Sequence, residues 1–149
     1  MASKALHAFA GTGIELEYVL VDRDSLAVRP IADAVLRDAS GAVVNALTLG
    51  RFGWSNELVL HLLELKSEGP EVSLEALAEG FQDAVRAMNA RLAPLGARLM
   101  PTGMHPWMNP RSETRLWPHE YAEIYATYDR VFDCRRHAWA NVAFSERNP

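Results

Sequence analysis

The chain has 149 residues, of which 49% are hydrophobic and 23% are charged, and its formal net charge is −4. This composition excludes a disordered chain, and the length matches one ordinary folded domain. An acidic balance without a run of Lys or Arg argues against a nucleic-acid-binding surface, and no stretch approaches the roughly 18 apolar residues that span a bilayer. We therefore expect a single domain, residues 1–149, with neither nucleic acid nor membrane as a partner.

The stretch GIELEYVLV, residues 13–21, is predicted to be a β-strand whose side chains alternate between two faces. One face carries the apolar residues Ile14, Leu16, Tyr18 and Leu20. The other carries Glu15, Glu17 and Val19. Two carboxylates so close repel each other unless water, a cation or a basic side chain lies between them. An oxygen-lined site for Mg²⁺ or Mn²⁺ would use such a pair, and a solvated polar face is the alternative.

Residues 22–56 give weaker signals. Asp22 to Ser25 has turn chemistry, and residues 26–28 are predicted to return as a short strand. A short helix is expected over residues 31–37, with Ile31, Ala34 and Val35 on one face. Residues 42–56 predict a weak strand followed by a loop punctuated by glycine.

The stretch ELVLHLLELK, residues 57–66, is dense in apolar residues and short, and Gly69 and Pro70 follow it. These features favour a buried strand over a helix, which would instead group Glu57, His61 and Glu64. As a strand it places Glu57 and Glu64 on opposite faces, with Glu64 among leucines. A carboxylate there is costly unless it is paired, hydrated or bound to metal. The alternative is that Glu64 lies beside Lys66 near the strand end and reaches solvent.

The clearest helix is predicted over residues 73–92, with Ser73 as its N-cap and Glu75 in the first turn. Its expected core stripe consists of Leu74, Leu77, Phe81, Val85, Met88 and Leu92. Pro94 and Gly96 are expected to end it, and residues 97–100 predict a short strand.

Residues 101–118 form a long predicted loop rich in proline and tryptophan, in which His105 could touch a ligand or be structural. A last helix is expected over residues 119–132, with inward side chains at Tyr121, Ile124, Tyr128 and Val131 or Phe132.

Cys134 and His137 have Cys-x-x-His spacing, but no second ligand pair completes a structural zinc site. Because Cys134 is the one cysteine, no internal disulfide can form. Together with the lack of signal-peptide character at the start of the chain, this predicts a cytoplasmic location.

Four blocks in consistent order carry a resemblance to a known family. They are GIELEYVLVD, WSNELVLHLLELKSEGP, LAPLGARLMPTGMHPW and ETRLWPHEYAEIYATYDRVFDCR. From residue 13 to residue 137 the chain resembles the N-terminal part of the type 2 glutamate–cysteine ligases, or carboxylate–amine ligases. The resemblance implies an α+β fold similar to the glutamine synthetase catalytic domain, with a partial antiparallel sheet open on one face and helices packed behind.

The resemblance also implies ATP-dependent amide-bond formation, in which glutamate is joined to cysteine or another amine through an acyl phosphate. Such chemistry needs a divalent cation, Mg²⁺ or Mn²⁺, because anionic phosphate and carboxylate groups must meet. Glu15 and Glu17 match the family's Glu-x-Glu metal pair, and Glu64 matches its acidic residue on the neighbouring strand. His105 and Trp107 are expected to help shape the substrate pocket. The family-like sheet is also compatible with a homodimer, and the resemblance identifies no catalytic or ATP-contacting residue here.

The resemblance weakens at the end of the chain. After Trp139 the family pattern continues into a strand with a His-x-Asn element and a long C-terminal half, whereas residues 142–149 are atypical. We therefore expect the N-terminal part of a larger catalytic domain, arising as a fragment or by a frameshift, that does not catalyse ligation alone. The alternative function is a non-catalytic domain that binds a metal, a nucleotide or a partner.

Overall fold

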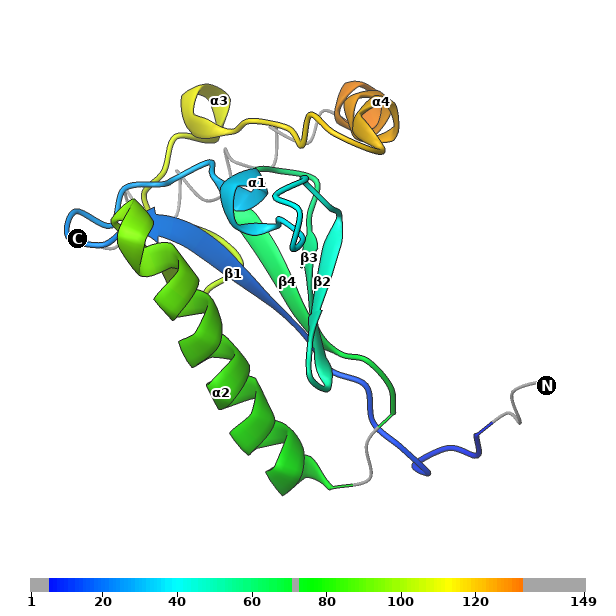
Figure 1. The fold of residues 1–149 in the computed structure, drawn as a ribbon. Helices are drawn as coiled ribbons and strands as arrows, with labels where there is room; N and C mark the ends of the chain where they lie inside the picture. The colour runs from blue at the N-terminus through cyan, green and yellow to red at the C-terminus, as the bar shows by residue number, and fades with distance from the viewer. Residues whose placement is uncertain (1–5, 71–72, 133–149) are drawn as a thin grey trace.

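The computed structural model describes residues 6–70 and 73–132, which form an α+β fold around one antiparallel sheet (Figure 1). The sheet has five strands in the order β2-β3-β4-β1-β5. The strands are β1 (Glu15–Asp22), β2 (Ala46–Leu49), β3 (Phe52–Asn56), β4 (Leu62–Ser67) and β5 (Ala97–Met100). The helices are α1 (Ala32–Val35), α2 (Leu74–Leu92), α3 (Pro110–Glu113) and α4 (Ala122–Phe132), with a 3-10 turn η1 (Ala93–Leu95). The predicted fold class, an antiparallel sheet with helices packed on one face, is confirmed.

Strand β1 lies between β4 and β5 and has the alternation that its sequence predicts. Tyr18 and Leu20 belong to the hydrophobic core, which lies on the α2 side of the sheet. Glu15 and Glu17 are exposed on the opposite face. Val19 and Val21 share that opposite face but are fully buried, so the face is open at its Glu15 end and covered at its Val21 end.

Helix α2 covers the core face of the sheet and begins where its sequence predicts (Figure 1). The Ser73 hydroxyl accepts a hydrogen bond from the Ala76 N–H at 3.2 Å, which satisfies one free donor of the first turn. The buried side chains of the helix are Leu77, Phe81, Ala84, Met88 and Leu92. The predicted stripe is wrong at Leu74, which is exposed because it precedes the first turn that reaches the sheet.

Residues 26–56 differ from their prediction in three places. Val28 forms a single bridge to Val21 in place of a returning strand, because the chain turns away after one pair. Helix α1 is one short turn that buries Ala32 and Val35 and leaves Ala34 exposed.

The predicted loop around residue 52 is instead strand β3, the second strand of a hairpin with β2. The strand has only five residues and contains Gly53, and glycine is uncommon inside strands, so the sequence favours a loop. Gly50, with φ at 68°, supplies the left-handed conformation of the turn.

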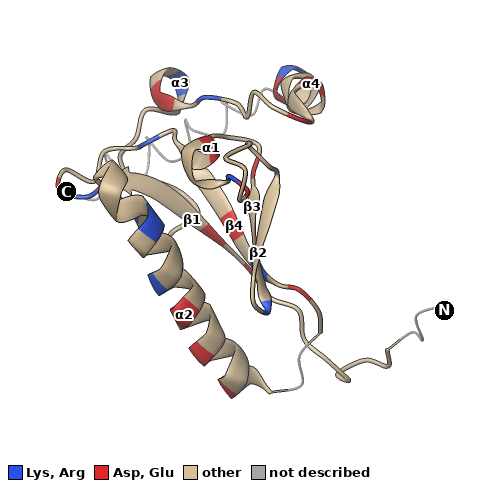
Figure 2. Ribbon diagram, in the orientation of Figure 1, with Lys and Arg blue, Asp and Glu red and all other residues tan. Residues whose placement is uncertain are grey.

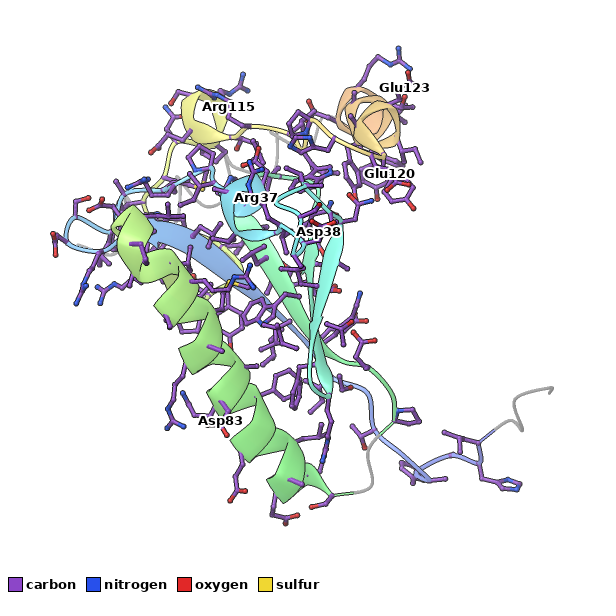
Figure 3. All side chains as sticks on the ribbon, viewed as in Figure 1. Arg37, Asp38, Asp83, Arg115, Glu120 and Glu123 are labelled. Atoms are coloured by element: carbon purple, nitrogen blue, oxygen red, sulfur yellow. The ribbon has the colours of Figure 1, made fainter. Side chains whose placement is uncertain are left out.

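Helix α4 stands apart from the sheet (Figure 1), and its predicted orientation is wrong. The predicted inward side chains Tyr121, Ile124, Tyr128, Val131 and Phe132 are all exposed. Tyr125 packs against the core instead, and the Asn56 side-chain amide donates a hydrogen bond to its hydroxyl at 3.1 Å. Asn45 donates to Glu120, which lies toward the sheet, whereas Glu123 points away from the body of the molecule (Figure 3).

None of the helices in the described ranges combines the length and the apolar character that a membrane crossing requires. The predictions for Cys134, His137 and residues 142–149 lie outside the described residues.

Candidate functional site

A row of polar side chains crosses three strands on the open face of the sheet. Glu17 of β1 lies directly opposite Glu64 of β4, and Glu64 lies directly opposite Ser55 of β3. Opposed residues of an antiparallel pair have Cα atoms about 5 Å apart and share a face. Figure 2 shows acidic positions side by side on β1 and β4. Two of the three carboxylates that the sequence assigns to a metal site, Glu17 and Glu64, therefore come together on neighbouring strands.

Glu64 is held by two hydrogen bonds to the same oxygen. Its Oε1 accepts from the Lys66 ammonium at 2.8 Å and from the Ser55 hydroxyl at 3.0 Å. Its side chain is only 15% exposed. Burial raises the pKa of Glu64, but the hydrogen bonds from Lys66 and Ser55 outweigh burial and hold that pKa below its ordinary value. Glu64 is thus an ionised carboxylate in mid-strand, paired with Lys66 rather than lying free in solvent.

Glu57 is a further carboxylate of the site. The sequence places it on the opposite face from Glu64, and this expectation is wrong because β4 begins only at Leu62. Residues 57–61 form an irregular connection, so strand alternation does not apply to them. Burial, together with the nearby charges of Glu64 and Glu17, raises the pKa of Glu57 to about 7. At neutral pH Glu57 therefore holds a proton for much of the time while Glu64 stays ionised.

Glu15 lies one pleat repeat along β1, directly opposite Lys66. The hydrogen bond to Glu64 raises the pKa of Lys66, and the charges of Glu64, Glu15 and Glu68 add to that effect. Lys66 therefore contributes a positive charge to a largely acidic part of the open face. Lys66 is two residues from Glu64, and residues two apart on a strand share a face. This spacing is the sequence signal that could have identified Lys66.

The loop after β5 approaches the same face. A Cβ atom built on Gly103 would lie 3.5 Å from Oε2 of Glu17, so the loop backbone lies against that carboxylate. His105 is buried. The backbone nitrogen of Trp107 lies 3.4 Å from Nδ1 of His105, and Nε2 of His105 lies 2.7 Å from the carbonyl oxygen of Leu26. In the tautomer that satisfies both contacts, Nε2 carries the hydrogen and donates to Leu26. The Trp107 side chain packs edge-on against His105 and is 62% exposed.

His105 thus anchors the loop, and Trp107 is available to a ligand. Their assignment to a substrate pocket stays a prediction.

The donor set fits a divalent cation of the magnesium kind. Among the residues that the structure describes, no three His, Cys, Asp or Glu side chains are grouped to hold a metal. Mg²⁺, however, is commonly bound through one or two carboxylates, with water and substrate phosphate completing its shell. Glu17 and Glu64 could supply two such carboxylates, whereas Glu15 lies two residues further along the strand, opposite Lys66. Ser55, Glu57 and Lys66 neighbour Glu64 in this candidate site, and sequence reasoning did not assign them to it.

Comparison with known proteins gives the chain its family. It is 33% identical over 136 residues to an uncharacterized protein of Archaeoglobus fulgidus, an alignment that covers 91% of this chain and 36% of that protein. The chain therefore spans about a third of the length of this curated relative. No solved structure matches it. The model of glutamate–cysteine ligase family 2 matches residues 12–142. The chain belongs to glutamate–cysteine ligase family 2.

Proposed function

We propose that the open face of the sheet is part of the active site of an ATP-dependent carboxylate–amine ligase that joins glutamate to cysteine. Family membership supports the ligase class. The observation that carries the site is the opposition of Glu17 and Glu64 on neighbouring strands of the open face.

In the proposed reaction the γ-carboxylate of glutamate attacks the γ-phosphorus of ATP, forming an acyl phosphate and releasing ADP. The amine nitrogen then attacks the acyl carbon, phosphate leaves, and the nitrogen loses a proton. A bound divalent cation would neutralise the anionic groups that meet in the first step. Glu17 and Glu64 would hold that cation, and Ser55 would keep Glu64 oriented by its hydrogen bond to Oε1.

The test is to titrate the 149-residue chain with Mn²⁺. Electron paramagnetic resonance measures the concentration of free Mn²⁺ and so gives the amount bound. Glu17→Gln and Glu64→Gln should each weaken Mn²⁺ binding at least about tenfold, because each removes an anionic ligand while keeping the side-chain shape. Glu79→Gln is the matched control, since Glu79 is exposed on α2, which packs on the other face of the sheet. Equal affinities for the wild-type chain and both site variants would contradict the proposed site.

A further inference from the structure

The ammonium of Lys66 lies beside the carboxylate of Glu64. The ammonium nitrogen is 2.8 Å from Oε1 of Glu64, and the Lys66 side chain is 37% exposed. Lys66 also lies directly opposite Glu15 across the β1–β4 pair, and Glu68 contributes to its electrostatic surroundings. The positive charge of Lys66 therefore lies against Glu64, one of the two carboxylates that we propose as metal ligands.

The pair differs from an ordinary surface ion pair. Glu64 is largely shielded from solvent, so salt and water screen its interaction with Lys66 less than they screen an exposed pair. Residues 64 and 66 also share one face of a strand, so the backbone holds the two side chains together at little cost in conformational freedom.

We propose that Lys66 is a resident counter-cation of the site, whose positive charge opposes the binding of a divalent cation at Glu64. This inference rests on the proposed function, because it takes Glu64 as a metal ligand. An ammonium and a divalent cation repel each other when both lie beside the same carboxylate. Lys66 therefore stabilises the metal-free site and lowers its affinity for the metal.

Removal of the Lys66 charge should tighten metal binding. We expect Lys66→Met, which keeps the aliphatic stem, to lower the Kd for Mn²⁺ about tenfold, as loss of a nearby positive charge in a partly shielded site predicts. Lys66→Arg keeps the charge and should bind Mn²⁺ like the wild-type chain. Calorimetric titration with Mn²⁺ alone measures both effects.

Arg98→Met is the matched control for charge removal from the same face. Arg98 is on β5 and lies opposite Val21 of β1. Val21 is four residues along β1 from Glu17. That spacing corresponds to about 13 Å along the strand, which exceeds the Debye length of about 8 Å at physiological salt. Arg98→Met should therefore leave the Kd for Mn²⁺ unchanged.

Thermal unfolding provides a second readout that needs no enzymatic activity. Without metal, Lys66→Met should lower the melting temperature, because Glu15, Glu17 and Glu64 then repel one another without a counter-charge. Added Mn²⁺ should raise the melting temperature of Lys66→Met more than that of the wild-type chain. If Lys66→Met does not fold, Lys66→Gln removes the same charge and keeps a hydrogen-bond donor.

The inference is overturned if the wild-type chain binds Mn²⁺ through Glu17 and Glu64 while Lys66→Met, or Lys66→Gln in its place, binds it equally or more weakly. In that case the proposed function stands and Lys66 only orients Glu64. Failure of every variant and of the wild-type chain to bind Mn²⁺ would overturn the proposed metal site and, with it, the role of Lys66.

Discussion

Glu57 and Glu64 are carboxylates of the same short stretch with opposite pKa shifts. Lys66 and Ser55 stabilise the charge of Glu64, whereas burial and neighbouring negative charge favour the neutral form of Glu57. The protonated Glu57 can donate a hydrogen bond, so the cluster carries fewer negative charges than its residue types suggest. A bound divalent cation would favour the ionised form of Glu57 as well, because a nearby positive charge lowers the pKa of a carboxyl group.

His61 gives a prediction about stability and pH. It is 6% exposed, and its Nδ1 has no hydrogen-bond partner among the described residues. Burial, with a further contribution from His105, lowers the pKa of His61 from 6.5 to about 4. Between these two values the unfolded chain binds more protons than the folded chain, so the free energy of unfolding must fall as the pH falls.

We expect the His61 contribution to the free energy of unfolding to fall by about 2 kcal/mol between about pH 7.5 and about pH 5. Urea denaturation at the two pH values measures the loss. In His61→Phe, which keeps a buried ring without the titrating group, the fall should be smaller by that amount, and His7→Gln, at an exposed residue, should behave like the wild-type chain. The same pH dependence in His61→Phe and in the wild-type chain would show that His61 is not responsible.

At the scale of elements, α2 approaches the sheet closely at Gly80. A Cβ atom there would lie 2.5 Å from Cζ of Phe52, and Phe52 packs against Phe81 with ring centroids 4.8 Å apart. The glycine therefore permits a close contact between α2 and β3, although glycine is a poor helix former.

Gly80→Ala should lower the free energy of unfolding by about 1 kcal/mol, because overpacking against Phe52 outweighs the gain in helix propensity of about 1 kcal/mol. The midpoint of urea unfolding measures this change. Phe52→Leu should reduce the penalty for Gly80→Ala, since the smaller side chain leaves room for the methyl group. If Gly80→Ala instead raises the free energy of unfolding, α2 and β3 can move apart to admit the methyl group without a loss of stability.

Helix α4 is attached through its Tyr125 side and exposes an apolar face. Ile124 is 60% exposed, whereas Tyr125 is partly buried and accepts a hydrogen bond from Asn56. We expect Ile124→Glu to change the free energy of unfolding by less than about 0.5 kcal/mol, and Tyr125→Ala to lower it by about 2 kcal/mol. Chemical denaturation of the two variants tests the orientation of the helix. A large loss in Ile124→Glu with little loss in Tyr125→Ala would indicate the inward face that the sequence predicts.

At the scale of the whole molecule, the chain spans 36% of the length of its archaeal relative. Both candidate metal ligands, Glu17 and Glu64, lie within this chain. Metal binding and ligation can therefore be examined separately.

We expect the purified 149-residue chain to bind Mn²⁺ without forming ADP in the presence of ATP, glutamate and cysteine, because metal ligands alone do not position the two reacting groups. A coupled assay for ADP measures this. ADP formation that depends on both amino acids and is lost in Glu15→Gln would contradict the prediction.

The parts of the fold that the sequence predicted are those with local signals. The alternation of β1, the Ser73 cap of α2 and the short strand after Gly96 each depend on residues within a few positions of one another. The resemblance to the ligase family likewise selected Glu15, Glu17 and Glu64, and β-pairing brings Glu17 and Glu64 together while Glu15 lies opposite Lys66.

Tertiary structure decided the features that depend on distant contacts. Strand β3 is formed by pairing with β2 and β4. Helix α4 turns Tyr125 inward, where it packs against the core and accepts a hydrogen bond from Asn56 of β3. Glu57 joins the site because residues 57–61 leave the strand geometry before β4 begins. The sequence by itself thus placed Glu15 and Glu17 on one face of a strand and selected Glu64 on the neighbouring strand. Only the packing of the chain decided which carboxylate carries a proton and which is paired with Lys66, because burial and the distances between charges set those properties.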